Sequence, residues 1–279
     1  MNLDSGSMIV RSNPSAKAWL ATVALLVTMA ASPAPAEMDD QCWPPGQPEY
    51  PVGLPDAVVS KASDFLLRAE GVPERPYWPG GKSGITIGAG WDVGYHTAGD
   101  LHKTWAKLDA EALGHLETAV GKRGPAAHAL LGGLDSVTIP RSLSLRVLNA
   151  SLKNDYQRLV IKLFPGAEKL PVEAQVVLIS LVFNRGDAMG RDPDWLTAKQ
   201  LDQRWEMRKM RDDVKRVDMY AMYAHLGIMK RLWEMPNARG LRIRRRDEQA
   251  LIRPLVNQQL KWEENRDRLK NSGLPPCRN

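Results

Sequence analysis

The stretch GGKSGITIGAGWD, residues 80–92, decides the fold of the region around it. Ile85, Thr86 and Ile87 form a short β-prone run, and glycines stand on both sides of this run. β-branched residues favour strands, and glycines allow the backbone to turn sharply. The stretch therefore predicts a β-hairpin.

Two nucleotide-binding loops resemble this stretch, but neither fits its spacing. A phosphate-binding loop that ends in Gly81, Lys82 and Ser83 requires a glycine where the chain has Pro76. A dinucleotide-binding loop that begins at Gly88 requires a third glycine at position 93, which is a valine. We therefore expect no nucleotide cofactor.

Outside the hairpin, helical patterns dominate. The stretch 171–186 is nearly apolar from Ala174 to Phe183, which predicts a buried central helix. We expect an α+β, mainly α-helical fold, with a small N-terminal lobe that carries the hairpin (about 56–100) and a larger helical lobe (about 101–272). The expected helices cover residues 56–70, 101–120, 142–164, 171–186, 194–215, 218–234 and 241–271.

The first 36 residues have the features of an export signal. Arg11 and Lys17 precede an apolar stretch at 18–32, and Ala34-Pro35-Ala36 has the form of a cleavage site. We expect cleavage after Ala36 and export to the periplasm or the extracellular space. The alternative is an uncleaved weak membrane anchor, for which the apolar stretch is short.

The cysteines lie near the two ends of the exported chain. Cys42 belongs to a Pro- and Gly-rich arm at 37–55, and Cys277 belongs to a C-terminal tail at 273–279. Because export leads to an oxidising compartment, we expect a disulfide bond that ties the arm to the tail. The alternative is two free thiols.

Charge and composition limit the possible partners. The formal net charge of +6 favours acidic polymers such as nucleic acid, teichoic acid or peptidoglycan, although a soluble basic surface explains it equally well. Few aromatic residues are interleaved with the basic ones, so we expect no nucleic-acid partner. The histidines show no metal-ligand spacing, so we expect no metal and no other cofactor.

Three residues in and before the hairpin suggest acid–base chemistry on a sugar polymer. Glu70 closes the first expected helix, and Thr86 and Asp92 can approach each other across the hairpin turn. Two carboxyl groups suit glycoside hydrolysis, because one protonates the leaving oxygen while the other activates water or stabilises the positive charge on the sugar. We expect Glu70 to be the acid, because apolar neighbours would raise its pKa, and Thr86 to hold the attacking water. Alternatively, Glu70 is a surface carboxylate, Asp92 forms an Asx turn and Thr86 is a plain strand residue.

The order of five sequence elements adds a resemblance to a known family. They are AEG at 69–71, Tyr77, SGITIGAGWDVG at 83–94, LISLVFNRG at 178–186 and RGLRIRRRDE at 239–248. This order resembles the phage-type lysozymes (glycoside hydrolase family 24-like) and is most similar to their pesticin-like branch of peptidoglycan-cleaving proteins. The resemblance spans about residues 58–255.

The resemblance implies roles for individual residues. It makes Glu70 the general acid, Thr86 the water-positioning hydroxyl, and Arg244 or Arg245 an arginine beside the acid that orients it and opposes its protonation. The second carboxylate of ordinary phage lysozymes falls on a glycine here, whereas the pesticin-like branch places an aspartate where this chain has Asp92. Glu74 is the alternative. The basic run at 239–248 can also be a solvated helix face.

Other residues are candidates for binding the glycan. Asn184 ends the central helix, where it either hydrogen-bonds the substrate or caps the helix. Tyr77, Trp78 and Trp91 either stack on sugar rings or pack in the core.

We therefore expect an exported muramidase that hydrolyses the β-1,4 bond between N-acetylmuramic acid and N-acetylglucosamine in peptidoglycan, acting as a monomer. A lytic transglycosylase needs a single acid and releases an anhydro sugar, so it should tolerate loss of Asp92. A non-catalytic peptidoglycan-binding protein is the third possibility. A toxin would need receptor-binding and translocation segments that the arm at 37–55 is too short to hold.

Overall fold

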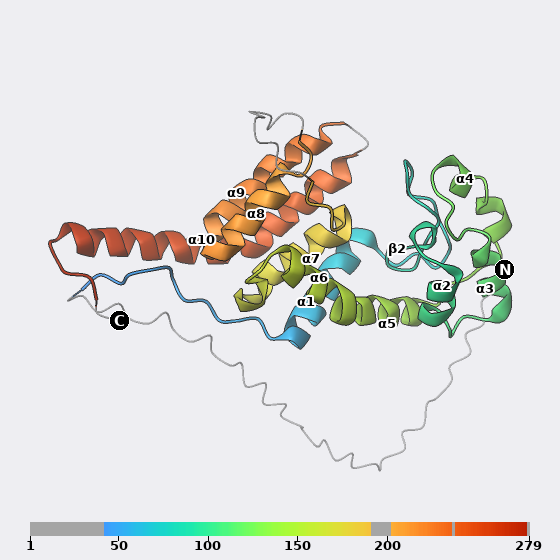
Figure 1. The fold of residues 1–279 in the computed structure, drawn as a ribbon, viewed down its shortest axis with the longest axis horizontal. Helices are drawn as coiled ribbons and strands as arrows, with labels where there is room; N and C mark the ends of the chain where they lie inside the picture. Colours follow the sequence, from blue (N-terminus) through green and yellow to red (C-terminus); the bar gives the residue numbers. More distant parts are fainter. Residues whose placement is uncertain (1–41, 191–201, 236–237, 278–279) are drawn as a thin grey trace, which may run out of the picture. The chain divides into compact units, whose positions relative to one another are not determined.

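The computed structural model describes residues 42–190, 202–235 and 238–277 (Figure 1). This part of the chain is mainly helical and carries a two-stranded antiparallel sheet, which confirms the expected mainly α-helical α+β class. The predicted export signal lies outside the described residues. Within them, no helix is long and apolar enough to cross a membrane.

The elements follow one another in this order: α1 (Pro55–Glu70), β1 (Thr86–Ile87), β2 (Trp91–Asp92), η1 (Val93–Tyr95), α2 (Ala98–Thr104), α3 (Ala110–Glu117), α4 (Pro125–His128), η2 (Leu131–Leu134), α5 (Arg141–Ser151), a π-helical turn η3 (Leu152–Tyr156), α6 (Gln157–Leu163), η4 (Ala167–Lys169), α7 (Val172–Arg185), α8 (Trp205–Arg216), α9 (Met219–Met229), η5 (Lys230–Trp233) and α10 (Arg239–Asn271).

The buried apolar side chains of the described residues form two clusters, and α5 contributes to both. One cluster gathers the hairpin, α2, α3, α4 and the first part of α5, up to Val147. The other gathers α1 and α6 to α10 together with Ala89 of the hairpin turn, and it begins on α5 at Leu148. The expected boundary between the lobes near residue 100 differs from this division, because α1 packs on α7 and the hairpin packs on the helices that follow it.

Helix α7 is the centre of the larger cluster, as its apolar sequence predicts. Every residue from Ala174 to Val182 is buried. Helices α1 and α10 pack against α7, and α8, α9 and α10 lie side by side (Figure 1). The helix ends before Gly186, whose φ of 71° is a conformation that glycine adopts at little cost.

Two of the predicted helices are interrupted. The helix expected at 101–120 divides into α2 and α3, because Trp105 is buried between them and the Asp109 side chain caps α3 by accepting from the amide of Ala112. The helix expected at 142–164 contains the π-helical turn η3 between α5 and α6. The helix expected at 194–215 is described only from Asp202 onward, where α8 begins at Trp205.

The disulfide bond between Cys42 and Cys277 is present, as predicted. Backbone hydrogen bonds reinforce it, because the amide of Trp43 donates to Pro275 at 3.0 Å and the amide of Cys277 donates back to Trp43 at 2.9 Å. Residues 42–54 contain no helix. The arm and the tail are therefore joined covalently and through their backbones.

Candidate active site

The hairpin places Thr86 directly opposite Asp92. Strands β1 and β2 pair in antiparallel register, with Thr86 against Asp92 and Ile87 against Trp91. On its other side Thr86 pairs with Tyr77, whose amide donates to Thr86 at 3.0 Å and whose carbonyl accepts from Thr86 at 2.8 Å. Tyr77, Thr86 and Asp92 thus lie next to one another on three adjacent backbone segments.

The glycines of the turn let the hairpin approach α5 and α7 closely. Gly88 has a φ of 55°, and a Cβ atom there would lie 2.7 Å from Oγ of Ser144 on α5. Gly90 has a φ of 95°, and a Cβ atom there would lie 2.9 Å from the ring of Phe183 on α7. Larger residues would push the turn away from both helices, so these glycines set the position of Thr86 and Asp92 relative to α7.

Both carboxylate oxygens of Asp92 accept hydrogen bonds from backbone amides. Oδ2 accepts from Gly84 at 2.9 Å and Oδ1 accepts from Gly94 at 2.9 Å. Asp92 therefore has the turn-forming role that was the alternative to a catalytic one. Each carboxylate oxygen can accept more than one hydrogen bond, so these contacts leave acceptor capacity free.

Glu70 is the last residue of α1 and forms an ion pair with Arg244 of α10. Its side chain is 29% exposed and its partner is a guanidinium group, so the structure does not give Glu70 the apolar neighbours that were expected. The Arg244 side chain is only 4% exposed. A buried guanidinium group thus fixes the direction of a partly exposed carboxylate, which is the arrangement expected of the arginine beside the acid.

A buried polar network holds Arg244 in place. Its Nε donates to Oγ of Ser180 on α7 at 3.0 Å, and its Nη2 donates to the carbonyl of Ser180 at 3.3 Å. The Ser180 hydroxyl in turn donates to Oε1 of Glu248 at 2.6 Å. Because an arginine can only donate and a serine has one hydroxyl hydrogen, the bonds run from Arg244 through Ser180 to Glu248.

Arg245 has a different role from Arg244. It is fully buried, donates to Oε1 of Glu248 at 2.6 Å and lies over the ring of Trp233. It therefore does not orient Glu70. The interpretation of residues 239–248 as a solvated face is wrong for these two arginines, whereas Arg242 and Arg246 are exposed.

Burial dominates the electrostatics of the network. It raises the pKa of Glu248 and lowers the pKa of Arg245, although each partner favours the charged form of the other. Oε2 of Glu248 and Nε of Arg245 have no hydrogen-bond partner among the described residues. The hydrogen-bonding capacity of these two buried side chains is thus only partly used.

The predicted residues converge on one large cleft of about 1470 Å³. Six of them line it: Glu70, Tyr77, Thr86, Trp91, Asp92 and Asn184. Burial raises the pKa of Tyr77, and the negative charges of Glu70 and Asp92 raise it further. Both carboxylates are therefore close enough to the phenol group of Tyr77 to influence its ionisation electrostatically. Glu74 does not line the cleft.

The aromatic residues divide between the cleft and its support. Trp91 lines the cleft, but one face of its ring stacks on His96 with the centroids 4.0 Å apart. Trp78 packs against His128, and its indole nitrogen donates to Ser83 at 2.9 Å. Trp78 thus supports the hairpin, while Trp91 presents one face at most to a ligand.

Asn184 is the penultimate residue of α7 and lines the cleft. Its Oδ1 atom is buried and has no hydrogen-bond partner within the described residues. This oxygen therefore does not cap the helix, which was the alternative to substrate binding. An unpaired buried acceptor at the edge of a cleft is suited to a ligand donor.

Sequence reasoning missed Ser180 and Glu248 as parts of the site. Glu248 belongs to the quoted run at 239–248, and its spacing from Arg244 places both on one face of a helix. Ser180 could have been found as well, because it is a hydroxyl residue inside a buried and mostly apolar helix. Such a residue needs a polar partner from another element.

Comparison with known proteins adds no identification. No protein-family model matches the chain, and no curated protein matches its sequence.

In the part of the chain that the structure describes, no group of three or more His, Cys, Asp or Glu residues is placed to hold a metal ion.

Proposed function

We propose that this protein is an exported muramidase that cleaves the β-1,4 bond between N-acetylmuramic acid and N-acetylglucosamine. The convergence of Glu70, Thr86 and Asp92 on a single cleft supports this function best. The cleft volume of about 1470 Å³ is large enough to hold a segment of a sugar polymer, and the disulfide is consistent with an oxidising compartment.

In this proposal Glu70 is the general acid. Protonated Glu70 gives its proton to the glycosidic oxygen while the bond to the sugar carbon breaks. Asp92 stabilises the positive charge that develops on the sugar ring and accepts a proton from the attacking water, which the hydroxyl of Thr86 holds and whose oxygen bonds to the sugar carbon. Arg244 positions the Glu70 carboxyl group through the ion pair between them.

A specific observation favours a lytic transglycosylase as the second candidate. Both oxygens of Asp92 are already engaged by the amides of Gly84 and Gly94. A transglycosylase needs only one acid, so a purely structural Asp92 is compatible with that activity. The reaction would form an intramolecular anhydro bond on the muramic acid and would need no attacking water.

Digestion of purified peptidoglycan, with mass spectrometry of the products, tests the proposal. The purified protein is compared with its Glu70→Gln and Asp92→Asn variants. Reducing muropeptides from the parent protein, with both variants nearly inactive, are the expected result. Anhydro products that persist in Asp92→Asn would establish a transglycosylase instead.

A third outcome would remove catalysis from the proposal. If the folded protein sediments with the cell wall but releases no product, then the cleft serves binding alone. Circular dichroism of each variant is needed, because Asp92 also shapes the hairpin through its two amide contacts.

A further inference from the structure

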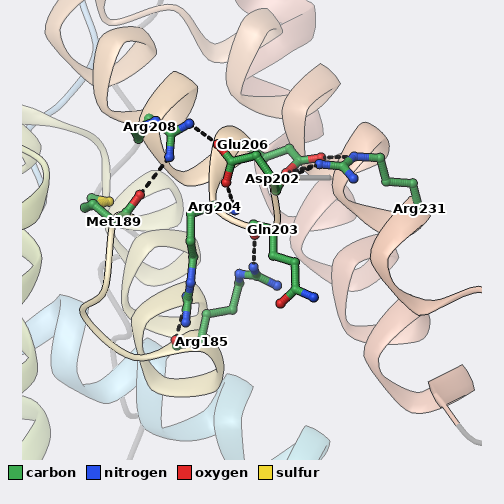
Figure 2. Close-up of polar contacts among 8 residues, drawn as sticks. All are labelled: Arg185, Met189, Asp202, Gln203, Arg204, Glu206, Arg208 and Arg231. Atoms are coloured by element: carbon green, nitrogen blue, oxygen red, sulfur yellow. Dashed lines mark hydrogen bonds and ion pairs between the residues drawn. The ribbon is translucent and has the colours of Figure 1, made fainter. Parts of the chain in front are cut away.

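Arginines gather where α7 ends and α8 begins (Figure 2). Those in the view are Arg185, Arg204, Arg208 and Arg231. Arg208 forms an ion pair with Asp202, and Arg231 forms one with Glu206 at 2.7 Å. These two arginines are therefore neutralised by carboxylates.

Arg185 and Arg204 are held by neutral groups instead. Arg185 donates to the backbone carbonyl of Gln203, and Arg204 donates to the backbone carbonyl of Arg185 at 2.7 Å, as Figure 2 shows. Within residues 42–190, 202–235 and 238–277, neither forms an ion pair with a carboxylate. Carbonyl groups fix a guanidinium in place without cancelling its charge.

The two uncompensated arginines are also the ones that face the cleft. Arg185 and Arg204 line it, whereas Arg208 and Arg231 do not. Burial lowers the pKa of Arg185 to about 10, and the positive charges of Arg204, Arg245 and Arg231 lower it further, against an opposing effect of Glu206. Asp187 also lines the cleft but forms no ion pair with either arginine among the described residues, and the two positive charges outnumber its single negative charge. This end of the cleft thus carries a local excess of positive charge that an anion would relieve.

Unpaired atoms at the same place indicate what kind of anion fits. Nε of Arg185 is a buried donor without a hydrogen-bond partner among the described residues. Oδ1 of the preceding Asn184 is a buried acceptor that also has no partner among them. A ligand that carries both a carboxylate and an amide N–H would satisfy both atoms. Peptides have this combination. N-acetylglucosamine lacks the carboxylate, and N-acetylmuramic acid has a free carboxylate only where no peptide is attached.

Building on the function proposed above, we propose that Arg185 and Arg204, with Asn184 beside them, form a carboxylate-binding subsite that recognises the peptide attached to N-acetylmuramic acid. The glycan lies along Glu70, Thr86 and Asp92, and the peptide extends toward the end of α7. The enzyme therefore prefers glycan strands that carry peptides over bare strands.

Three forms of one soluble glycan substrate test this subsite. The first carries its peptides, the second has them removed by an amidase, which leaves only the lactyl carboxylate, and the third carries peptides whose carboxylates are chemically amidated. Initial rates give kcat/KM for each form with the full-length protein and its variants. For Arg185→Gln and Arg204→Gln we expect kcat/KM to fall about 10-fold or more on the first substrate and less than about 3-fold on the other two.

Matched variants separate recognition from folding. Arg158→Gln removes the same charge from an exposed arginine that also lines the cleft and pairs with Asp155, and it should leave the substrate preference unchanged. Arg185→Lys keeps the charge and should recover part of the preference. Thermal unfolding of each variant identifies a loss of structure, and a variant with a lowered Tm is replaced by its lysine counterpart.

Several results would overturn the subsite. An equal loss on all three substrates would mean a structural role for the arginines. A loss that persists on the amidase-treated glycan would assign the anion to the lactyl group and not to the peptide. If neither variant loses kcat/KM on the peptide-bearing substrate, the subsite is refuted while the proposed muramidase activity stands.

Binding distinguishes failure of this subsite from failure of the proposed function. If the wild-type protein hydrolyses none of the substrates, calorimetric titration with the first and third forms still shows whether the subsite binds a carboxylate. Salt-sensitive binding of the carboxylate form that Arg185→Gln weakens would uphold the subsite. Equal binding of the two forms would overturn it.

Discussion

Arg244 on α10 donates a hydrogen bond from Nη1 to Oε1 of Glu70 at the end of α1, across 174 positions of the sequence. The same guanidinium group donates to the hydroxyl and the carbonyl of Ser180 on α7. A single buried side chain thus joins the three helices on which the proposed acid depends. The orientation of Glu70 follows from the packing of these helices and not from its own partly exposed surroundings.

Replacing Arg244 should impair both catalysis and stability. Lysine keeps the charge but has a single nitrogen, which cannot reach Glu70 and Ser180 together, so we expect Arg244→Lys to lower kcat/KM at least about 10-fold. Arg244→Gln removes the buried partner of a partly exposed carboxylate and leaves Ser180 without its donor, so it should cost about 1–3 kcal/mol in the free energy of unfolding. Urea denaturation and initial rates measure the two effects.

Arg242→Lys is the matched control, because Arg242 is exposed on the same helix. It should change neither quantity appreciably. Full activity of Arg244→Lys would contradict the positioning role of this arginine.

Glu248 should make stability depend on pH. Burial raises its pKa above the ordinary value of 4.5, and this effect exceeds the opposing effects of Arg245, Ser180 and Arg244. The folded protein therefore binds this proton more tightly than the unfolded chain does. The stabilisation is complete below about pH 4.5 and is lost as the pH rises through the raised pKa of the folded state.

Glu248→Gln cannot titrate and lacks this dependence. The difference in unfolding free energy between the wild type and Glu248→Gln should shift in favour of the variant as the pH rises, measured by urea denaturation from roughly pH 4 to pH 8. Glu264→Gln, which changes an exposed glutamate of the same helix, is the matched control. A constant difference across this range would contradict the prediction.

The sequence predicted the features that local pattern encodes. Glycines and β-branched residues near Thr86 indicated the hairpin, and the apolar run in α7 indicated a buried helix. The sequence also suggested that Thr86 and Asp92 can approach each other across the turn, and the observed register sets them opposite each other. These elements depend on residues that are close in sequence, which is why they could be predicted.

The polar contacts between distant residues could not be predicted in this way. The amides that engage Asp92 come from Gly84 and Gly94, and their direction depends on the backbone after folding. Arg185 is the last residue of α7 and Arg204 directly precedes α8, and these two distant positions meet through the hydrogen bond from Arg204 to the carbonyl of Arg185. Their net charge at the cleft depends on which neighbours are neutralised, and that information is absent from any short stretch of sequence.

Gly84 should be intolerant of a side chain. A Cβ atom there would collide with Oδ1 of Asp92 and would lie 2.6 Å from Cα of Gly94. We expect Gly84→Ala to displace Asp92, to lower kcat/KM about as much as Asp92→Asn does, and to cost about 1–3 kcal/mol of stability. Chemical denaturation and the wall-digestion assay measure both.

Gly114→Ala is the appropriate comparison, because Gly114 lies within α3 and a Cβ atom there meets nothing within 4 Å. Alanine should stabilise that helix by up to about 1 kcal/mol. If Gly84→Ala behaves like Gly114→Ala, then the tight fit around Asp92 is not required.

The disulfide bond should contribute to stability without contributing to catalysis. Neither Cys42 nor Cys277 lines the cleft, and the bond closes a loop between residues 235 positions apart. We expect the double variant Cys42→Ser/Cys277→Ser to lose about 2–5 kcal/mol of unfolding free energy and to keep its kcat/KM at a temperature where it stays folded. The wild type under reducing conditions should match the variant in guanidinium denaturation, and a difference between them would contradict the assignment of the effect to the bond.

Substitutions of Thr86 distinguish hydrolysis from the transglycosylase reaction. Its side chain is buried in β1 and lines the cleft. Valine keeps the branched shape and removes the hydroxyl, whereas serine keeps the hydroxyl and removes a methyl group. If the hydroxyl positions the attacking water, Thr86→Val should lower the hydrolytic kcat about 100-fold while Thr86→Ser stays within about 10-fold of the wild type. A reaction without an attacking water would respond to shape instead, so a Thr86→Val enzyme that still releases anhydro products at the wild-type rate would argue for the transglycosylase.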